Sequence, residues 1–572
     1  MTVKPLNGAQ ILMGCLKREG VDTIFGYPGG NVIPIFDAIL DSDIKLVLTR
    51  HEQGATHAAD GYARITGKTG VVLVTSGPGA TNTLTGIYTA YMDSIPLVIL
   101  TGQTISPALG TDAFQESDIS GMSFATVKHS YLVKNVNDLP RIIKEAFYIA
   151  HSGRQGPVLI DLPKDVGMAS GATSFADSVN LPGYQIPGKA KQEAVEQAAV
   201  AIRKSRKPLI LTGHGAIASG ANRVVKELAE KLCSPVSSTL LGLGAFPASH
   251  ELSLGMTGMH GTVTANRAMR ECDLLISIGA RFDDRITAKI SEFAKLCEVV
   301  HIDIDPAEYG KIITPRHFLC GDAKIVLEQL LPLVEKLDSA EWLKSVNSWK
   351  KKYPLSYPKH GGLRAQHVIQ NIYEVTNGKA VIVTDVGQHQ LWSAQFFKCD
   401  YPGQFLTSGG AGTMGYGLPA AVGAAFGNRT GFPVCAILGD GGFQMTLCEL
   451  ATACINKLPI KIFVMDNRFL GMVRQWQDMF YDKRYSSVSL EGNPDFVKLA
   501  NAYGIEALYI NSNNDARQAV EKAMKFDDGP ILVHCECEQE DNVFPMIPPG
   551  ASIDDIMIER PKETLEKPIG GA

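Results

Sequence analysis

An internal repeat constrains the fold of this 572-residue chain more than any other feature. Residues 71–102 (VVLVTSGPGATNTLTGIYTAYMDSIPLVILTG) and 434–467 (VCAILGDGGFQMTLCELATACINKLPIKIFVMDN) each read as strand, glycine-rich turn, helix, proline and strand. The segments 76–96 and 439–459 have the same length, so the two copies align without a gap. Because their strands are continuously apolar, we expect buried parallel strands joined by right-handed crossovers.

The rest of the chain extends this repeat into three domains. A helix and a strand precede each copy, beginning at Ala9 and at Ala365, and a third strand–turn–helix unit lies at 207–232. Linker-like stretches rich in Gly, Pro, Ser or Lys occur around 167–189 and 348–362. The sequence therefore predicts an α/β protein of three doubly wound parallel-sheet domains, at 1–175, 190–345 and 362–572.

Composition narrows the class of function. The net charge is only −5 and no apolar run approaches the roughly 20 residues that span a bilayer, so we expect no nucleic-acid or membrane partner. The N-terminal segment lacks the long apolar core of a secretory signal.

Most cysteines stand singly in apolar runs, as buried thiols would (Cys233, Cys272, Cys435, Cys454). The cluster at 534–537 has no second ligand pair at zinc-site spacing, which favours packing. We expect a cytoplasmic protein acting on small molecules.

An acid stands where a buried strand of the second repeat ends. Ligands of doubly wound sheets bind beyond the carboxyl ends of the strands, and Asp440 is at that position, flanked by glycines. Asn467 follows the next strand, 27 residues later. Carboxylate and amide oxygens suit Mg²⁺, and glycines let a diphosphate approach the backbone. The pair predicts a metal-diphosphate site; the alternative is that Asp440 caps a helix.

The first repeat has Gly77 where the second has Asp440, so it cannot bind a metal in the same way. Its distinctive acid is Glu52, at the junction between the apolar strand KLVLT and an alanine-rich helix. Such a carboxyl is suited to exchanging a proton with a ligand. The alternative is an acid that interacts only with the helix dipole.

Many separated motifs resemble one enzyme family. GDG at 439–441 followed by the Asn of MDN resembles the thiamine-diphosphate motif, and RHEQGATHAADGYAR resembles the segment that carries the catalytic glutamate of these enzymes. FGYPGG, GTDAFQE, ARFDDR, GTMGYGLPAA and LGMVRQWQ are similar to segments of the acetohydroxyacid synthase (acetolactate synthase) family. The resemblance implies pyrimidine-binding and diphosphate-binding domains flanking a Rossmann-like FAD domain. It also implies condensation of two pyruvates to 2-acetolactate and CO₂, or of pyruvate with 2-ketobutyrate, in branched-chain amino-acid biosynthesis.

The resemblance also assigns roles around the thiamine cofactor. Glu52 would exchange a proton with its aminopyrimidine ring, and Mg²⁺ would be held by Asp440, Asn467 and the main-chain oxygen of Phe469. Further catalytic positions would be Gly30, Gln115, Lys164 and Arg285. The remaining cofactor contacts would be Tyr27, Pro28, Gly29, Gln388, His389, Gly412, Met414, Gly441, Gly442 and Met472. The substrate pocket would contain Phe114, Val473 and Trp476.

In the middle domain the resemblance implies a flavin without a redox step. The FAD contacts would be Arg154, Gly213, Thr257, Gly258, Met259, His260, Gly279, Ala280, Arg281, Asp283, Asp303 and Asp322. The family assembles as homodimers or homotetramers in which Glu52 and the metal site meet across a subunit interface, and a small regulatory subunit can bind. Two departures concern the site: Asn31 stands where the family usually has Ala, and Asp466 where it usually has Asn.

Three alternatives remain open at this stage. A flavin-dependent pyruvate oxidase or a simple 2-keto acid decarboxylase shares the cofactor motifs, although GTDAFQE, RFDDR and QWQ match the synthase. A catabolic acetolactate synthase would lack FAD. A nucleotide-binding regulatory protein could use the same α/β domains without catalysis, and would not require the acid at Glu52.

Overall fold

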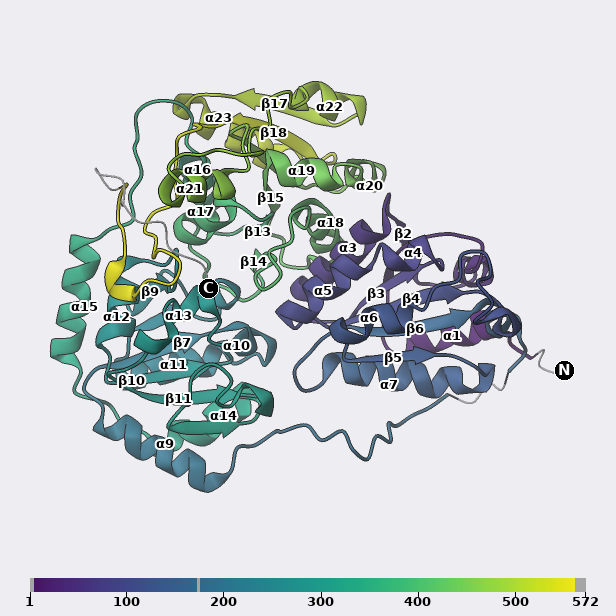
Figure 1. Ribbon diagram of the computed structural model, residues 1–572, viewed down its shortest axis with the longest axis horizontal. Helices are drawn as coiled ribbons and strands as arrows, with labels where there is room; N and C mark the ends of the chain where they lie inside the picture. The colour runs from purple at the N-terminus through teal and green to yellow at the C-terminus, as the bar shows by residue number, and fades with distance from the viewer. Residues whose placement is uncertain (1–4, 172–174, 561–572) are drawn as a thin grey trace.

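The computed structural model describes residues 5–171 and 175–560, and these residues form three six-stranded parallel sheets (Figure 1). The first contains β1 (Thr23–Tyr27), β2 (Lys45–Leu48), β3 (Gly70–Val74), β4 (Leu97–Gln103), β5 (His129–Leu132) and β6 (Val158–Pro163). The second contains β7 (Pro208–Thr212), β8 (Val236–Ser238), β9 (Ser253–Met256), β10 (Leu274–Ile278), β11 (Glu298–Asp303) and β12 (His317–Cys320). The third contains β13 (Val381–Thr384), β14 (Phe405–Leu406), β15 (Val434–Gly439), β16 (Lys461–Asp466), β17 (Glu506–Ile510) and β18 (Ile531–Glu536).

The first and third sheets have the same topology. Their strand orders are β2-β1-β3-β4-β6-β5 and β14-β13-β15-β16-β18-β17, so each strand of one has a counterpart in the other. The central strands β3, β4, β15 and β16 are buried along their whole length, which explains their continuously apolar sequences. The predicted α/β class and the predicted repeat are confirmed.

The middle sheet follows a different order, β12-β11-β10-β7-β8-β9. Numbered within the domain, this is 6-5-4-1-2-3, the order of dinucleotide-binding doubly wound folds. The strand order reverses at β7 and β10, which pair in parallel. Ligands of such sheets bind at this switch point, beyond the carboxyl ends of the strands.

Helices cover both faces of each sheet. In the first domain they are α1 (Gly8–Arg18), α2 (Ile33–Leu40), α3 (Glu52–Thr66), α4 (Pro78–Thr81), α5 (Leu84–Asp93), α6 (Ile119–Ser123), α7 (Leu139–His151) and α8 (Lys164–Met168). In the middle domain they are α9 (Gln192–Lys204), α10 (His214–Ala218), α11 (Asn222–Leu232), α12 (Val263–Glu271), α13 (Asp284–Thr287), α14 (Ala323–Leu330) and α15 (Ala340–Lys352). In the third they are α16 (Ala365–Thr376), α17 (Gln388–Phe396), α18 (Gly417–Gly427), α19 (Asp440–Thr446), α20 (Glu449–Ile455), α21 (Gly471–Phe480), α22 (Phe496–Ala502) and α23 (Asn513–Lys525).

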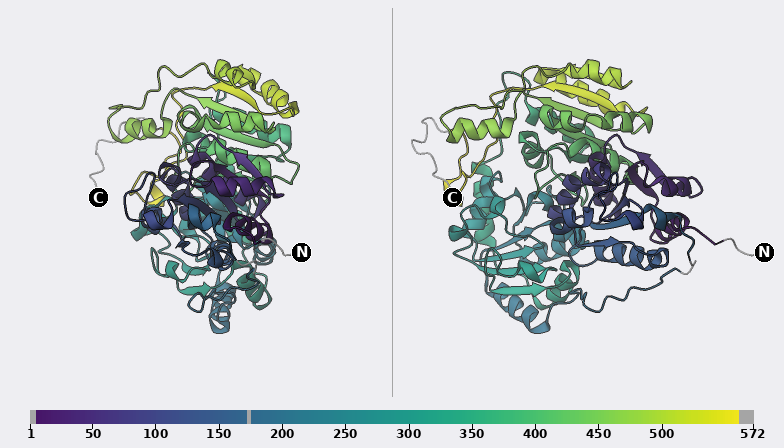
Figure 2. Two further views of the ribbon diagram at one scale, coloured as in Figure 1. Left: turned by 90° about the vertical axis from the view of Figure 1, so that its right-hand side faces the viewer. Right: turned by 45° about the vertical axis from the view of Figure 1, so that its right-hand side comes forward.

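The three domains form three lobes, and the first and third meet through a helix pair (Figures 1 and 2). Helix α3 packs against α18 so closely that a Cβ on Gly61 would collide with the Ala420 carbonyl, and one on Gly423 with the Ala58 carbonyl. Glycine is therefore required at both positions for the helix backbones to touch. This contact holds the middle of α3 against the third domain.

The linkers predicted between the domains are irregular in the structure. Residues 175–190 run along the molecule to α9 without helix or strand (Figure 1), and 353–364 carry neither between α15 and α16. The exact domain boundaries stay predictions. No helix within 5–171 or 175–560 has both the length and the apolar character needed to cross a bilayer.

The cysteines are free thiols. Cys272 and Cys435 are buried, as predicted. The same prediction is wrong for Cys233 and Cys454, which are only partly buried. Cys233 caps the end of α11 in a left-handed conformation, where the chain turns at the protein surface. Cys535 and Cys537 are buried in a hydrophobic core of the third domain.

Candidate functional site

Asp440 and Asn467 end two neighbouring strands of the third sheet. Gly439, the last residue of β15, pairs with Met465 in β16, so Asp440 and Asn467 both emerge at the carboxyl edge. Asp440 is 2% exposed and begins α19. The alternative that Asp440 caps this helix is wrong, because Gly439 occupies the cap position and the helix has no side-chain cap.

A polar network surrounds Asp440. The Asn493 side-chain amide donates to Asp440 Oδ2 at 2.8 Å and to Asp466 Oδ1 at 3.1 Å. The other Asp466 oxygen lies 2.9 Å from His534 Nε2. Asp466, the departure from the usual Asn, therefore has partners for both its oxygens. Burial, followed by the negative charge of Asp466, raises the pKa of Asp440 to about 8. A cation bound beside Asp440 would therefore stabilise its ionised carboxylate.

The residues around Asp440 fit a magnesium ion that also binds phosphate. Within the described residues no three His, Cys, Asp or Glu side chains are arranged to hold a metal alone. Asn467 Oδ1 accepts from the Phe469 backbone N–H at 3.1 Å, which folds this segment into a tight turn beside Asp440. One carboxylate, one amide and one carbonyl leave the remaining positions of an octahedral ion to ligand oxygens and water.

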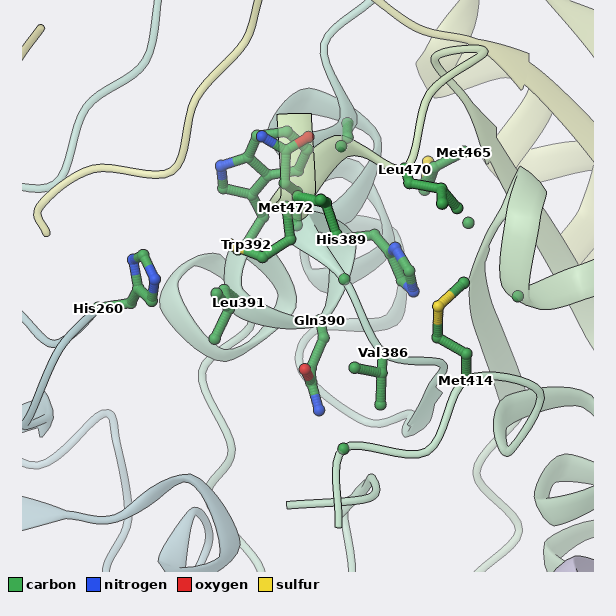
Figure 3. A pocket seen from close by; sticks show the side chains of 18 of the residues that line it. His260, Val386, His389, Gln390, Leu391, Trp392, Met414, Met465, Leu470 and Met472 are labelled. Carbon is green, nitrogen blue, oxygen red and sulfur yellow. The ribbon is translucent and has the colours of Figure 1, made fainter. Parts of the chain in front are cut away.

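Glycines line a cavity of about 410 Å³ next to this pair, called here the first cavity. A Cβ on Gly442 would collide with the Asp385 carboxylate, and one on Gly439 would lie 2.8 Å from the His389 ring. Gly441 lies between Leu470 and Met414, whose side chains a Cβ would approach to 2.9 and 3.5 Å. Figure 3 shows His389, Met414 and Leu470 around the same space. Only glycine leaves room here for a ligand to reach the backbone.

Buried polar atoms without partners line the first cavity. His389 Nε2, His260 Nδ1 and Trp476 Nε1 have no hydrogen-bond partner in the structure. Burial lowers the pKa of both His389 and His260 to about 4, so both rings are neutral. Because unpaired buried polar groups are costly, these atoms indicate that a polar ligand completes the site.

A second cavity of about 510 Å³ lies at the switch point of the middle sheet. Gly213 and Gly215 pack directly against the Gly279 backbone, with no room for side chains between them. The Arg154 guanidinium reaches the cavity from the first domain and pairs with Asp305 at 3.0 Å and with Glu308 at 2.8 Å. Arg285 lines both cavities, so the two are adjacent.

Glu52 lies in the first domain and lines neither cavity. It begins α3, and its Oε2 accepts from the Asn82 side chain at 3.0 Å. A Cβ on Gly79 would lie 3.4 Å from the other Glu52 carboxylate oxygen. Nearby, the Asn31 amide donates to Ser76 Oγ at 2.6 Å, so the second departure from the family pattern is accommodated by a hydrogen bond at the same strand ends.

The predicted site residues other than Gly258 therefore fall into three groups. The first cavity is lined by Thr257, Met259, His260, Arg285, Gln388, His389, Gly412, Met414, Asp440, Gly441, Gly442, Asn467, Phe469, Met472, Val473 and Trp476. The second is lined by Arg154, Gly213, Gly279, Ala280, Arg281, Asp283, Arg285, Asp303 and Asp322. The group in the first domain comprises Tyr27, Pro28, Gly29, Gly30, Glu52, Phe114, Gln115 and Lys164, none of which lines either cavity.

The structure differs from the expected grouping in the middle domain. Thr257, Met259 and His260 are expected at the flavin but line the first cavity, because this segment packs on the third domain through a bond from Gln395 Nε2 to the His260 carbonyl at 2.9 Å. Gly258 lines neither cavity, since it packs against the Arg285 backbone.

Sequence reasoning missed several residues of the site. Asp385 accepts from the backbone N–H groups of Gly415 and Gly417 and so shapes the segment that carries Met414. It lies within TDVGQHQ, a motif that could have revealed it. Asn493 follows Asn467 by 26 residues in a loop, and no local pattern marks it.

Comparisons with known proteins agree with this arrangement. Three models described as thiamine pyrophosphate enzyme domains match: the N-terminal TPP binding domain over 6–122, the central domain over 195–330 and the C-terminal TPP binding domain over 385–535. The acetolactate synthase large subunit of Porphyra purpurea is 46% identical over 561 residues, which cover 95% of this chain and 94% of the relative. The acetolactate synthase isozyme 2 large subunit of Escherichia coli (strain K12) is 44% identical over 564 residues, which cover 96% and 99%. With this identity over nearly its whole length, the chain belongs to the acetolactate synthase large-subunit family of thiamine-diphosphate enzymes.

Proposed function

We propose that this chain condenses two pyruvates to 2-acetolactate with loss of CO₂, and also accepts 2-ketobutyrate as the second substrate, in branched-chain amino-acid biosynthesis. The observation that carries the proposal is the first cavity, in which Asp440 and Asn467 face a glycine-lined space with unpartnered buried polar atoms. The free cysteines suit a reducing compartment, the cytoplasm.

Thiamine diphosphate and Mg²⁺ fit the first cavity. Asp440, Asn467 and the Phe469 carbonyl would hold the metal, and Gly441 and Gly442 would accept the diphosphate against their backbone. When bound, the cofactor supplies a nucleophilic carbon and an electron sink for decarboxylating a 2-keto acid. The apolar side chains of Leu470, Met472 and Val473 line the same cavity and would lie beside the bound cofactor.

FAD fits the second cavity. The close backbone contact of Gly213, Gly215 and Gly279 would let a dinucleotide approach the backbone beyond the carboxyl ends of β7 and β10. Asp303 ends β11 and Asp322 precedes α14, so both carboxylates lie at the carboxyl edge, where the ribose hydroxyls of dinucleotides are bound in such folds. The condensation has no redox step, so a flavin here would serve the structure of the site.

A homodimer would complete the active site. Glu52, Gln115 and Phe114 lie in the first domain and contribute nothing to the first cavity of their own chain. Phe114 is 87% exposed, as expected of a residue that a second subunit covers. We therefore propose that Glu52 of one subunit serves the cavity of the other. The relatives are large subunits, which makes a small regulatory subunit a further proposed partner.

Omitting each cofactor in turn tests the proposed function. We expect acetolactate formation from pyruvate to require thiamine diphosphate and Mg²⁺, and the purified chain to be yellow and to lose activity when FAD is removed. The measurement is colorimetric detection of acetolactate, with acetaldehyde and acetyl phosphate assayed in parallel. Acetaldehyde or acetyl phosphate as the main product would contradict the proposal and favour a decarboxylase or an oxidase.

Trp476 is expected to set the preference for 2-ketobutyrate. It lies on α21, lines the first cavity, and has the Arg285 guanidinium 5.8 Å above its ring. We expect Trp476→Leu to lower the ratio of 2-ketobutyrate to pyruvate use about tenfold, the effect of losing a well-fitted apolar contact. The measurement is competition between the two acceptors. Phe480→Leu is the control, since Phe480 packs on Trp476 without lining the cavity; an equal change in both variants would show that Trp476 acts only in packing.

A further inference from the structure

Residues 408–416, called here the wall segment, separate the two cavities. Gly412 and Met414 line the first cavity, Gly410 lines the second, and Gly409 lines both. The conformation of one short segment therefore shapes both ligand sites at once.

Asp93, the last residue of α5 in the first domain, holds the start of the wall segment. Its Oδ2 accepts from the Gly409 backbone N–H at 3.0 Å, and its Oδ1 from that of Gly410 at 2.6 Å. Oδ2 also pairs with Arg64 Nη2 at 2.7 Å. The Asp93 side chain is wholly buried and that of Arg64 is 6% exposed. A buried carboxylate or guanidinium is tolerated in a protein interior only where ion pairs and hydrogen bonds compensate for the loss of water.

The same helices hold the far end of the wall segment. Arg64 Nε also pairs with Asp60 Oδ1 at 2.6 Å, and this carboxyl oxygen accepts from the Tyr416 hydroxyl at 2.7 Å. Between the two ends, the hydroxyls of Thr89 and Thr413 are hydrogen-bonded at 2.7 Å. Helices α3 and α5 thus fix the wall segment near 409–410, at 413 and at 416.

All three domains meet at Gly410. A Cβ there would lie 3.1 Å from Asp93 of the first domain and 3.1 Å from Arg281 of the middle domain. Arg281 lines the second cavity. A shift of the wall segment at Gly410 would therefore displace groups in both cavities, because packed interiors transmit such shifts.

We propose that Asp93 is a positioning residue that couples the two cavities: by fixing Gly409 and Gly410 it lets a flavin in the second cavity favour the wall conformation that thiamine diphosphate requires in the first. The proposal rests on the proposed function, because it takes these two molecules as the ligands. Coupling of this kind is reciprocal, so each ligand tightens binding of the other by the same factor.

The test measures binding rather than turnover. The dissociation constant of thiamine diphosphate, with Mg²⁺ present, is measured on the full chain with and without FAD, and that of FAD with and without thiamine diphosphate. In the unaltered protein we expect each to tighten the other about fivefold or more. In Asp93→Asn we expect both to bind, with a coupling factor that falls to within about twofold of unity. Asp43→Asn, at an exposed surface ion pair, is the control and should keep the full coupling.

Full coupling in Asp93→Asn, or no coupling in the unaltered protein, would overturn the proposal. Failure of the unaltered protein to bind either molecule would instead overturn the proposed function, and the proposal with it. If circular dichroism shows that Asp93→Asn does not fold, Thr89→Val tests the same wall segment at similar volume. It removes the hydroxyl that is hydrogen-bonded to Thr413 at 2.7 Å and that also donates to the Thr85 carbonyl at 2.9 Å. We expect this variant to lose at least about half of the coupling factor, and unchanged coupling would overturn the proposal.

Discussion

Replacing Glu52 with glutamine is expected to reduce acetolactate formation from pyruvate by about 100-fold or more. Glutamine keeps the size of the side chain and can still accept the hydrogen bond from Asn82. It cannot take up and release a proton at neutral pH, which is the role proposed for Glu52 at the cofactor. The measurement is kcat with pyruvate at saturating thiamine diphosphate, Mg²⁺ and FAD, so that weaker cofactor binding does not limit the rate.

The control for this variant is Glu193→Gln. Glu193 is also an acid in the first turn of a helix, α9, but it is exposed and lines neither cavity. If Glu52 served only the helix dipole, both substitutions would cost about 0.3–1 kcal/mol of stability and leave kcat unchanged. Equal turnover in the two variants would therefore contradict the proton-transfer role and leave Glu52 a structural acid.

The fold could be predicted from the sequence because its signals are local and repeated. Continuous apolar strands bounded by Gly and Pro occur in the two aligned segments, and the two sheets have the same strand order. The order within a sheet is set by contacts between distant strands. For that reason periodicity alone does not give the different order of the middle sheet, in which β7 pairs with β10 across some 60 residues.

The functional site likewise contains residues that could be predicted from the sequence and residues that could not. Asp440 and Asn467 could be predicted because each follows a recognisable strand. Asn493 and Asp93 could not, because each acts through a hydrogen bond to a residue far away in the chain. Glu449 is a further case: it accepts from the backbone N–H groups of Arg50 and His51, directly before Glu52, although some 400 residues separate them.

Replacing Asp440 with asparagine is expected to weaken binding of Mg²⁺ and thiamine diphosphate by about 100-fold or more. Even partners outside the ligand shell of a metal contribute 10- to 100-fold to affinity, so a direct carboxylate ligand should contribute at least that much. The measurement is the Mg²⁺ concentration that gives half-maximal acetolactate formation, with the exposed Asp43→Asn variant as the control. Unchanged Mg²⁺ dependence would place the metal elsewhere.

The same substitution is expected to leave the metal-free protein equally or more stable, and the difference should depend on pH. Burial, and then the charge of Asp466, raises the pKa of Asp440 from 3.8 to about 8. A group whose pKa is raised on folding stabilises the fold fully at a pH below the pKa that it has in the unfolded chain. This stabilisation is lost as the pH rises through the pKa that the group has in the folded protein. Asparagine stays neutral throughout, so the stability of the variant relative to the unaltered protein should increase between about pH 4 and 8.

Thermal unfolding of both proteins at pH 5 and pH 8, with a chelator present, measures this difference in stability. A variant less stable than the unaltered protein at pH 8 would show that the Asp440 carboxylate is already neutralised by its neighbours, and that the metal is not needed to balance its charge.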